Sequence, residues 1–390
     1  MMLRFPYFNL LDHGPTIPTE PPRPRFLLEV PGKGFPCRAI AGRDSVAVVT
    51  GCWTPREGQL LVFDATTGAL RFTHDAEPGR YQGFAAFTPG GDVLFATIGS
   101  DVAIHRLDGH GKLVGVDRFR LRALPPEPFV SAEVSVVGLE VVDEDRCLVS
   151  LFEDDEPFGS YTTLRARGTE QWMIRGSFDG RAGDRVFGHV WLRLDVIAEQ
   201  RPLECRALDT GEVLWSRTPP DHEHEGVCGS TGGLAIVNSS ARAAAIAMKR
   251  PVLPPALLMS IDATSGRTRW SHALDAFPLS VMASPNAVAI ILDRGDQPGT
   301  WMCFDADGGL LRAGSFSAVL EKMNHGERPF VAAVDGAHVL LWERGLLRCE
   351  ELTPAGRTVW EVPLPGDPPE VMLMDGAICA RNGRQLTVLG

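Results

Sequence analysis

One short pattern recurs along the 390-residue chain and constrains its fold more than any other feature. In segments such as LLVFDATTGALRF and LLMSIDATSGRTRW, a glycine in a polar turn is followed four residues later by an aromatic residue. The pattern occurs at Gly68 and Phe72, Gly168 and Trp172, Gly211 and Trp215, Gly266 and Trp270, and Gly356 and Trp360. A repeat of this kind indicates one structural unit copied along the chain.

The residue before each turn is apolar in every copy, including two copies that lack the aromatic residue (IHRLDGHGKLVGV and MCFDADGGLLRAG). These residues are Phe63, Leu107, Leu164, Leu208, Ile261, Phe304 and Leu352. Such a column predicts one buried face of a β-strand. Successive turns are 43 to 57 residues apart, which is room for four short strands. We therefore predict an all-β protein, a β-propeller of four-stranded antiparallel blades.

The two ends of the chain are predicted to share one blade. Residues 370–390 provide only three strands, and the segment RFLLEVP (25–31) provides a fourth. We expect the N-terminal strand to complete the last blade, which gives eight blades and closes the ring. Seven blades with an unpaired tail is the alternative. The domain prediction is a single propeller over 25–390, preceded by an apolar, proline-rich arm over 1–24 that folds back on the propeller or docks on a partner.

The repeat aromatics are interpreted as structural residues. Repetition at blade spacing explains Phe72, Trp172, Trp215, Trp270 and Trp360 without a ligand, so we expect each to fill the gap between neighbouring blades. The turn glycines are expected to adopt positive φ, which only glycine does without steric cost.

The segments Ala207 to Trp215 and Ser260 to Trp270 resemble the A-x-D-x-x-T-G-x-x-x-W pattern of the PQQ-like, quinoprotein-type propeller repeat. This family includes quinoprotein enzymes, which typically use a disulfide between adjacent cysteines and a calcium site, so the resemblance would imply these features in an enzymatic member. The eight cysteines here include no adjacent pair, and there is no CxxCH haem motif. The resemblance therefore implies a non-enzymatic member without PQQ or another cofactor. The lipoprotein signal of BamB-type members is not evident, and the Gly-His pairs at 109–110 and 188–189 lack the Trp-Asp endings of WD40 repeats.

The net charge of −11 disfavours nucleic-acid binding. Arg118, Arg120 and Arg122 alternate along a predicted strand and are interpreted as a solvated face. No secretion signal and no run of 18 apolar residues is evident, so we expect a cytoplasmic protein without a membrane role, monomeric by itself.

The long connections are predicted to gather on one face of the propeller. Within a blade, the connections between the first and second strands and between the third and fourth strands are tight, whereas the others contain the insertions, for example 153–160 and 240–256. Long loops on a rigid scaffold commonly carry binding. We predict a scaffold or regulatory subunit that binds a protein partner through Glu153, Asp154, Asp155, Glu156, Ile246, Met248, Lys249 and Arg250.

A metal site is a further hypothesis. His222 and His224 alternate on one side of an extended segment, DHEHEGVC, and two imidazoles with a third ligand could hold a divalent ion. A solvated connection between blades is the competing interpretation. The corresponding alternative function is a metal-dependent lyase or hydrolase with its site at the propeller axis. No catalytic motif is found in the sequence, so no catalytic residue is predicted.

Overall fold

The structure is a computed structural model of the whole chain. It describes residues 16–31, 36–51, 58–77, 80–99, 101–119, 134–153, 159–175, 185–194, 202–217, 223–228, 234–240, 256–320, 323, 328–364, 370–374 and 376–390. These residues form 32 β-strands and no α-helix. No helix long and apolar enough to cross a membrane is found in this part of the chain.

The strands form four-stranded antiparallel sheets, numbered here in chain order. Sheet 1 contains β2 (Pro36–Ala41), β3 (Ser45–Thr50), β4 (Gln59–Asp64) and β5 (Leu70–Asp75). Sheet 2 contains β6 (Tyr81–Phe87), β7 (Val93–Ile98), β8 (Val102–Leu107) and β9 (Leu113–Phe119). Sheet 3 contains β10 (Val134–Val141), β11 (Arg146–Glu153), β12 (Gly159–Ala166) and β13 (Thr169–Arg175). Sheet 4 contains β14 (Arg185–Phe187), β15 (Val190–Leu194), β16 (Leu203–Ala207) and β17 (Val213–Arg217).

The second half of the chain repeats this arrangement. Sheet 5 contains β18 (Glu223–Cys228), β19 (Leu234–Ser240), β20 (Ala256–Asp262) and β21 (Thr268–Leu274). Sheet 6 contains β22 (Phe277–Ala283), β23 (Ala287–Asp293), β24 (Pro298–Asp305) and β25 (Leu310–Val319). Sheet 7 contains β26 (Phe330–Val334), β27 (His338–Glu343), β28 (Leu346–Glu351) and β29 (Thr358–Pro363). Sheet 8 contains β30 (Glu370–Met374), β31 (Ala377–Asn382), β32 (Gln385–Leu389) and, at its outer edge, β1 (Pro24–Glu29).

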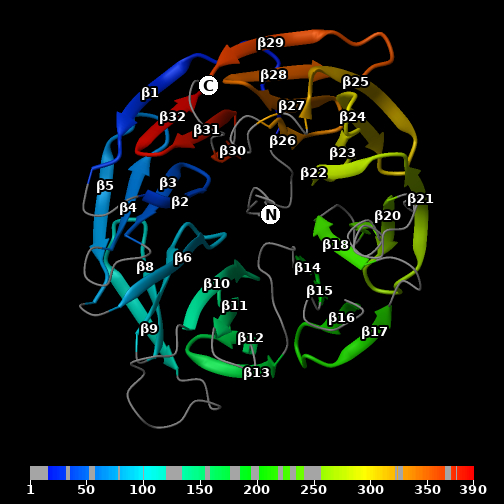
Figure 1. Cartoon of the computed structure of the whole chain (residues 1–390). Coiled ribbons are helices and arrows are strands. Elements are labelled where there is room, and N and C mark those ends of the chain that lie inside the picture. Colours follow the sequence, from blue (N-terminus) through cyan, green and yellow to red (C-terminus); the bar gives the residue numbers. More distant parts are fainter. Residues whose placement is uncertain are drawn as a thin grey trace.

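The sheets lie side by side around a central axis, as expected for a β-propeller (Figure 1). The first strand of each of sheets 1 to 7 is near the axis and the fourth is at the perimeter. In sheet 8 the perimeter strand comes from the other end of the sequence. There β1 pairs antiparallel with β32, and Phe26 lies opposite Val388.

The core consists of slices between neighbouring sheets. The predicted apolar column is buried in all seven copies, and its most exposed member, Leu352, is only 4% exposed. Between sheets 1 and 2, Val62 packs in one cluster with Phe95 and Leu107. A similar cluster joins sheets 8 and 1. Each sheet therefore adds its own share of core, which is how a long chain can fold around a single axis.

The turns between the third and fourth strands of sheets 1, 2, 5 and 6 are stabilised by an aspartate. In sheet 1, one carboxylate oxygen of Asp64 accepts the backbone N–H groups of Thr66 and Thr67 at 2.9 and 2.8 Å. The expected positive φ is confirmed at six of the repeat's turn glycines: Gly68, Gly111, Gly168, Gly211, Gly266 and Gly308.

The expectation of positive φ is wrong at Gly356, which does not adopt it. In that turn the closing hydrogen bond joins Glu351 to Arg357, one residue farther than the equivalent bond from Asp262 to Arg267. Glycine is required there for a different reason. A Cβ on Gly356 would lie only 2.3 Å from the carbonyl oxygen of Glu351.

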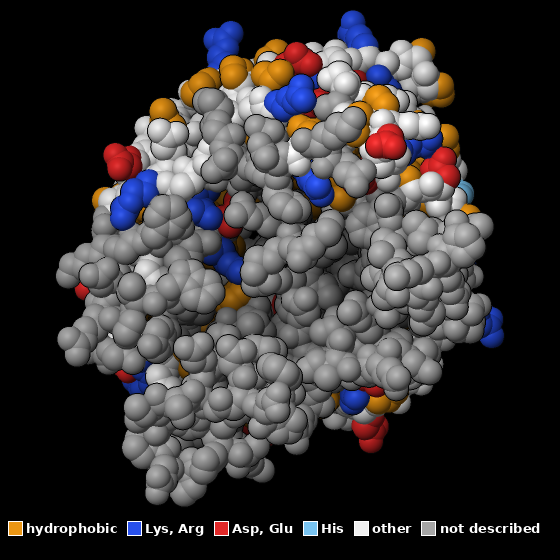
Figure 2. All heavy atoms as spheres, viewed as in Figure 1, with side chains coloured by type: hydrophobic (Ala, Val, Ile, Leu, Met, Phe, Trp, Pro, Cys, Tyr) orange, Lys and Arg blue, Asp and Glu red, His pale blue; other side chains and the backbone are white. Residues whose placement is uncertain are grey.

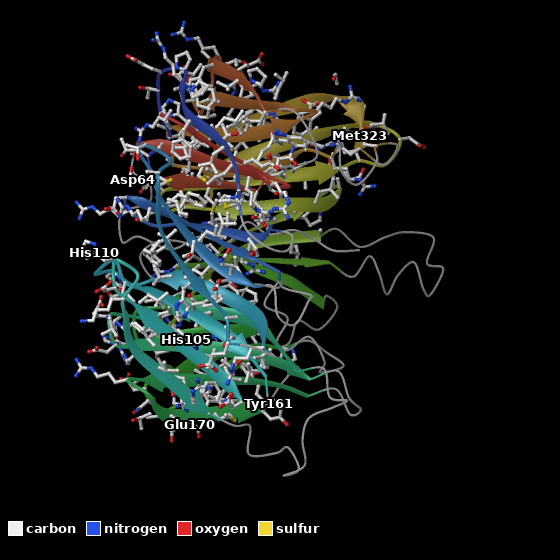
Figure 3. All side chains as sticks on the ribbon, turned by 90° about the vertical axis from the view of Figure 1, so that its left-hand side faces the viewer. Asp64, His105, His110, Tyr161, Glu170 and Met323 are labelled. Carbon is white, nitrogen blue, oxygen red and sulfur yellow. The ribbon has the colours of Figure 1, made fainter. Side chains whose placement is uncertain are left out.

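The two faces of the ring carry different connections (Figure 3). Asp64 ends β4, and His110 is in the turn between β8 and β9; both lie on one face, here called the tight-turn face. Met323, between sheets 6 and 7, lies on the opposite face, here called the long-connection face.

Candidate functional site

Neighbouring sheets are joined by the repeat tryptophans of the outer strands. Each of three indole N–H groups donates to a backbone carbonyl in the turn of the following sheet. The bonds run from Trp172 to Leu208 (2.7 Å), from Trp215 to Ala263 (2.9 Å) and from Trp270 to Ala306 (2.9 Å). A buried indole N–H needs such an acceptor, so the bonds fix the ring orientation as well as the sheet spacing.

The aromatic rings also lie against the turn glycines of the following sheets. A Cβ placed on these glycines would meet ring atoms at distances between 2.4 and 3.0 Å, too close for a real side chain. The pairs are Gly111 with Phe72, Gly211 with Trp172, Gly266 with Trp215 and Gly308 with Trp270. The repeat glycine is thus needed both for its φ and for the space it leaves to the ring. This geometry supports the structural interpretation of these aromatics.

An equivalent junction, between sheet 7 and the segment before β1, is built from residues near the two ends of the described chain. Trp360 of sheet 7 donates its indole N–H to the carbonyl of Pro18, at 2.8 Å, and Pro18 precedes β1. Next to it, Ile17 is 3% exposed and donates its backbone N–H to Asp335 at 2.9 Å. The described part of the arm therefore packs on sheet 7 and supplies the carbonyl that a turn supplies elsewhere.

A further ring, not anticipated from the sequence, joins sheet 8 to sheet 1. Phe26 of β1 lies against Gly68, and its Cγ is 2.7 Å from the position of a Cβ on that glycine. The sequence contains part of the repeat pattern here, since Phe26 is the third residue of an outer strand, as Phe72 and Trp270 are. The turn glycine four residues before the aromatic is missing because no strand of the sheet precedes β1 in the sequence.

Two junctions use charged side chains in place of a ring. Between sheets 2 and 3, Arg165 binds Asp117 through two bonds, Nη2 to Oδ1 at 2.6 Å and Nε to Oδ2 at 2.8 Å. These side chains are 5% and 12% exposed. Between sheets 6 and 7, Arg312 lies 3.0 Å from Glu350, which is 5% exposed. These are the two copies in which the repeat aromatic is missing.

A histidine pair lies between sheets 1 and 2. Nε2 of His74 is 2.8 Å from Nδ1 of His105, so one ring donates to the other. Burial lowers the pKa of both imidazoles, and that of His105 falls to about 4, with a further contribution from His74. His105 is 3% exposed, and its Nε2 has no hydrogen-bond partner among the described residues. Burial therefore disfavours protonation of both rings.

An ion-pair network lies close to this pair, at the ends of strands on the long-connection face. Arg80 is buried, and its Nε donates to Glu77 at 2.9 Å. Arg80 also pairs with Asp101, and Arg118 pairs with Glu77. The hydrogen bond from Arg118 is the main cause of the lowered pKa of Glu77. Arg118 is thus exposed, as expected for a solvated face, and its guanidinium is paired with Glu77. Figure 2 views this face, and the described acidic and basic side chains around its rim are interspersed.

Most of the predicted partner-binding residues lie outside the described residues. This applies to Asp154, Asp155, Glu156, Ile246, Met248, Lys249 and Arg250, whereas Glu153 is the last residue of β11. The metal hypothesis stays a prediction as well. His222 lies outside the described residues and His224 is in β18. Within the described ranges, no group of three or more candidate ligands comes together.

Comparisons with known proteins support the fold. No family model matches the chain, and no curated protein does. The structure is similar to BamB from Moraxella catarrhalis, with a TM-score of 0.54, 12% identity, and coverage of 94% of this chain and 99% of that one. It is also similar to the C-terminal WD40 domain of Sif2, with a TM-score of 0.57, 9% identity, and coverage of 93% of this chain and 98% of that one. A third similar structure is the Dos1 propeller, with a TM-score of 0.58, 9% identity, and coverage of 95% of each chain. At these identities the likeness shows a β-propeller fold alone.

Proposed function

We propose that this protein is a non-catalytic scaffold or regulatory subunit, built as one closed ring of eight four-stranded blades, that binds a protein partner through its long-connection face. The PQQ-like character of the repeat and a cytoplasmic location are part of the same proposal. So is the assignment of Glu153 to Glu156 and of Ile246, Met248, Lys249 and Arg250 to the binding surface.

Ring closure is supported by β1 and by the junctions on either side of sheet 8. The supporting contacts are the pairing of β1 with β32, the bond from Trp360 to Pro18 and the contact of Phe26 with Gly68. A closed ring has no free end sheet, so its loops are held by a rigid frame. Rigid frames that display long loops are well suited to binding.

The difference between the two faces carries the functional proposal. On the tight-turn face the charged residues largely bind one another, as in the pairs of Arg71 with Asp64 (2.8 Å) and Arg146 with Asp209 (2.6 Å). Those groups are already engaged in holding the turns. The sequence places its long connections, among them 153–160 and 240–256, on the other side. The length of these connections favours the long-connection face as the surface for a partner.

The proposal is tested by purification of the tagged full chain from its native host, with quantification of co-purifying proteins by mass spectrometry. One variant carries Glu153→Ser, Asp154→Ser, Asp155→Ser and Glu156→Ser, and a second carries Ile246→Ser, Met248→Ser, Lys249→Ser and Arg250→Ser. The control carries Arg267→Ser and Arg357→Ser, two exposed positions in tight turns. We expect a stoichiometric protein partner whose recovery falls about fivefold or more in the loop variants and is unchanged in the control.

Equal recovery from all three variants would show that the partner binds elsewhere. A chain that purifies without a protein partner but with a stoichiometric divalent metal, lost after His222→Ala and His224→Ala, would contradict the scaffold function and favour the metal-dependent alternative.

A further inference from the structure

The junction between sheets 2 and 3 lacks the ring that fills the equivalent space elsewhere. Gly115 of β9 pairs with Arg106, in the same register in which Phe72 pairs with Val62. Gly115 is exposed, and a Cβ placed on it would meet no atom of the described residues within 4 Å. The position that carries a phenyl or indole at other junctions thus has no side chain and meets no described atom.

The opposite wall of this space is a turn glycine that no ring covers. Gly168 keeps the positive φ of the repeat, +82°. At Gly68, Gly111, Gly211, Gly266 and Gly308 a ring atom lies within 3.0 Å of the Cβ position, but at Gly168 the nearest described atom is Oδ1 of Asp117 at 3.8 Å. We call the space between Gly115 and Gly168 the Gly115 notch.

The notch does not have to be filled for the two sheets to hold together. The buried pair of Asp117 and Arg165 joins the sheets beside it, and Nη2 of Arg165 also donates to the carbonyl of Gly168 at 3.0 Å. The Arg165 guanidinium lies 4.3 Å from the centre of the Phe119 ring. Arg165 is 5% exposed, so this contact holds the two sheets together and leaves the notch beside it unfilled.

The rim of the notch is apolar on the perimeter strand. Leu113, Val114 and Val116 of β9 are 46%, 59% and 39% exposed. The positions in β5 equivalent to Val114 and Val116 carry the polar residues Arg71 and Thr73, and those in β21 carry Arg269 and Ser271. Among the described strands β9 pairs only with β8, so no described strand covers the outer edge of β9.

We propose that the edge of β9 and the Gly115 notch bind an extended segment of a partner protein, which adds a strand to sheet 2 and inserts one aromatic side chain into the notch. The other junctions identify the aromatic side chain, because Phe72, Trp172, Trp215 and Trp270 occupy this space next to a turn glycine there. Main-chain pairing with a strand edge provides affinity, and the pocket provides specificity. Lys112 is exposed at the start of β9 and favours an acidic residue near the end of the segment.

This surface lies on the perimeter, whereas the proposed function uses the long-connection face, so the two proposals can fail separately. The probe is a fluorescein-labelled nine-residue peptide of threonine and valine with a central tryptophan and a terminal glutamate. A matched peptide carries alanine in place of tryptophan. Binding to the full chain is followed by fluorescence anisotropy.

We expect the tryptophan peptide to bind about tenfold more tightly than the alanine peptide. Gly115→Trp fills the notch from within and is expected to weaken binding about tenfold without lowering the unfolding temperature. Val114→Glu is expected to weaken binding too. Its matched control is Leu214→Glu, at the equivalent position of sheet 4 and 50% exposed, and it should bind as the wild type does.

The proposal is overturned if the tryptophan peptide does not bind, or binds no better than the alanine peptide. It is also overturned if Gly115→Trp leaves the affinity unchanged. Should Gly115→Trp not fold, the comparison of Val114→Glu with Leu214→Glu decides, and equal effects of these two substitutions contradict the proposal.

Discussion

The phenyl ring of Phe26 lies against the backbone of Gly68, and the two residues belong to sheets 8 and 1, the last and the first along the chain. The contact repeats the geometry of Trp215 on Gly266, although β1 has no repeat turn before it. One side chain near the start of the described chain thus performs the role of the repeat aromatic for the final sheet.

We expect Phe26→Ala to lower the free energy of unfolding by about 2 to 4 kcal/mol, because it removes a half-buried ring and empties a junction. Urea unfolding of the full chain measures the change. The neighbouring Leu27 is 64% exposed, so Leu27→Ala should change stability by less than about 0.5 kcal/mol. Similar small effects of both substitutions would show that the contact with Gly68 contributes little.

A comparison of two glycines with nearly the same φ distinguishes the cost of backbone strain from the cost of lost packing. Gly266 has φ +69° and faces the Trp215 ring, with an atom 2.8 Å from its Cβ position, whereas Gly376 has φ +65° and meets no described atom within 4 Å. Gly376→Ala should cost about 1 kcal/mol, the strain of a left-handed alanine. Gly266→Ala should cost roughly 1 to 3 kcal/mol more, because the ring must move. Equal melting temperatures for the two variants would contradict the packing role of the repeat glycine.

The hydrogen bond from Trp360 to Pro18 is tested by substitution of Trp360 with phenylalanine, which keeps an aromatic ring but has no N–H to donate. Trp360→Phe should remove about 1 kcal/mol and loosen the segment before β1. Hydrogen exchange of the Ile17 amide, which donates to Asp335, should then become faster. Trp270→Phe removes the same kind of bond, to Ala306, and is the control. Exchange at Ile17 that rises equally in both variants would mean that the effect is global.

The histidine pair predicts a loss of stability in acid. The pKa of His105 is about 4 in the folded chain and about 6.5 when unfolded, so below pH 6.5 the unfolded state binds the proton more readily. Stability should therefore fall as the pH is lowered from 6.5 to 4, by up to about 3 kcal/mol from this group. In His105→Leu that part of the pH dependence should disappear. The charged residues near the pair, Asp75, Glu77, Arg80 and Arg118, are unchanged in this variant, so their own contribution to the pH dependence stays. Parallel pH profiles of unfolding for variant and wild type would contradict this assignment.

The parts of the fold that could be predicted from the sequence are those that repeat. The apolar column and the aromatics of the repeat recur at blade spacing, so their burial and their role between sheets follow from periodicity. Gly356 was predicted with the wrong φ because the extra residue in its turn changes the backbone path but not the pattern of residue types.

Contacts between distant single residues could not be predicted in this way. Asp117 and Arg165 are 48 residues apart and belong to no motif, and the pairing of His74 with His105 depends on two sheets meeting. The proposed binding residues were inferred from loop length and composition, which indicate a surface but not its partner; they are Glu153 to Glu156, Ile246, Met248, Lys249 and Arg250.

The bond from Trp360 to Pro18 spans 342 residues of sequence, which has a consequence for biosynthesis. During translation β1 is the first strand to be made and its partner β32 is the last. The edge of β1 and the phenyl ring of Phe26 therefore stay unpaired while sheets 1 to 7 are made. Contacts of such long range form slowly. The newly made chain therefore passes through a stage in which the edge of β1 and the Phe26 ring have no partner, and in this period it is most prone to aggregate or to need a chaperone.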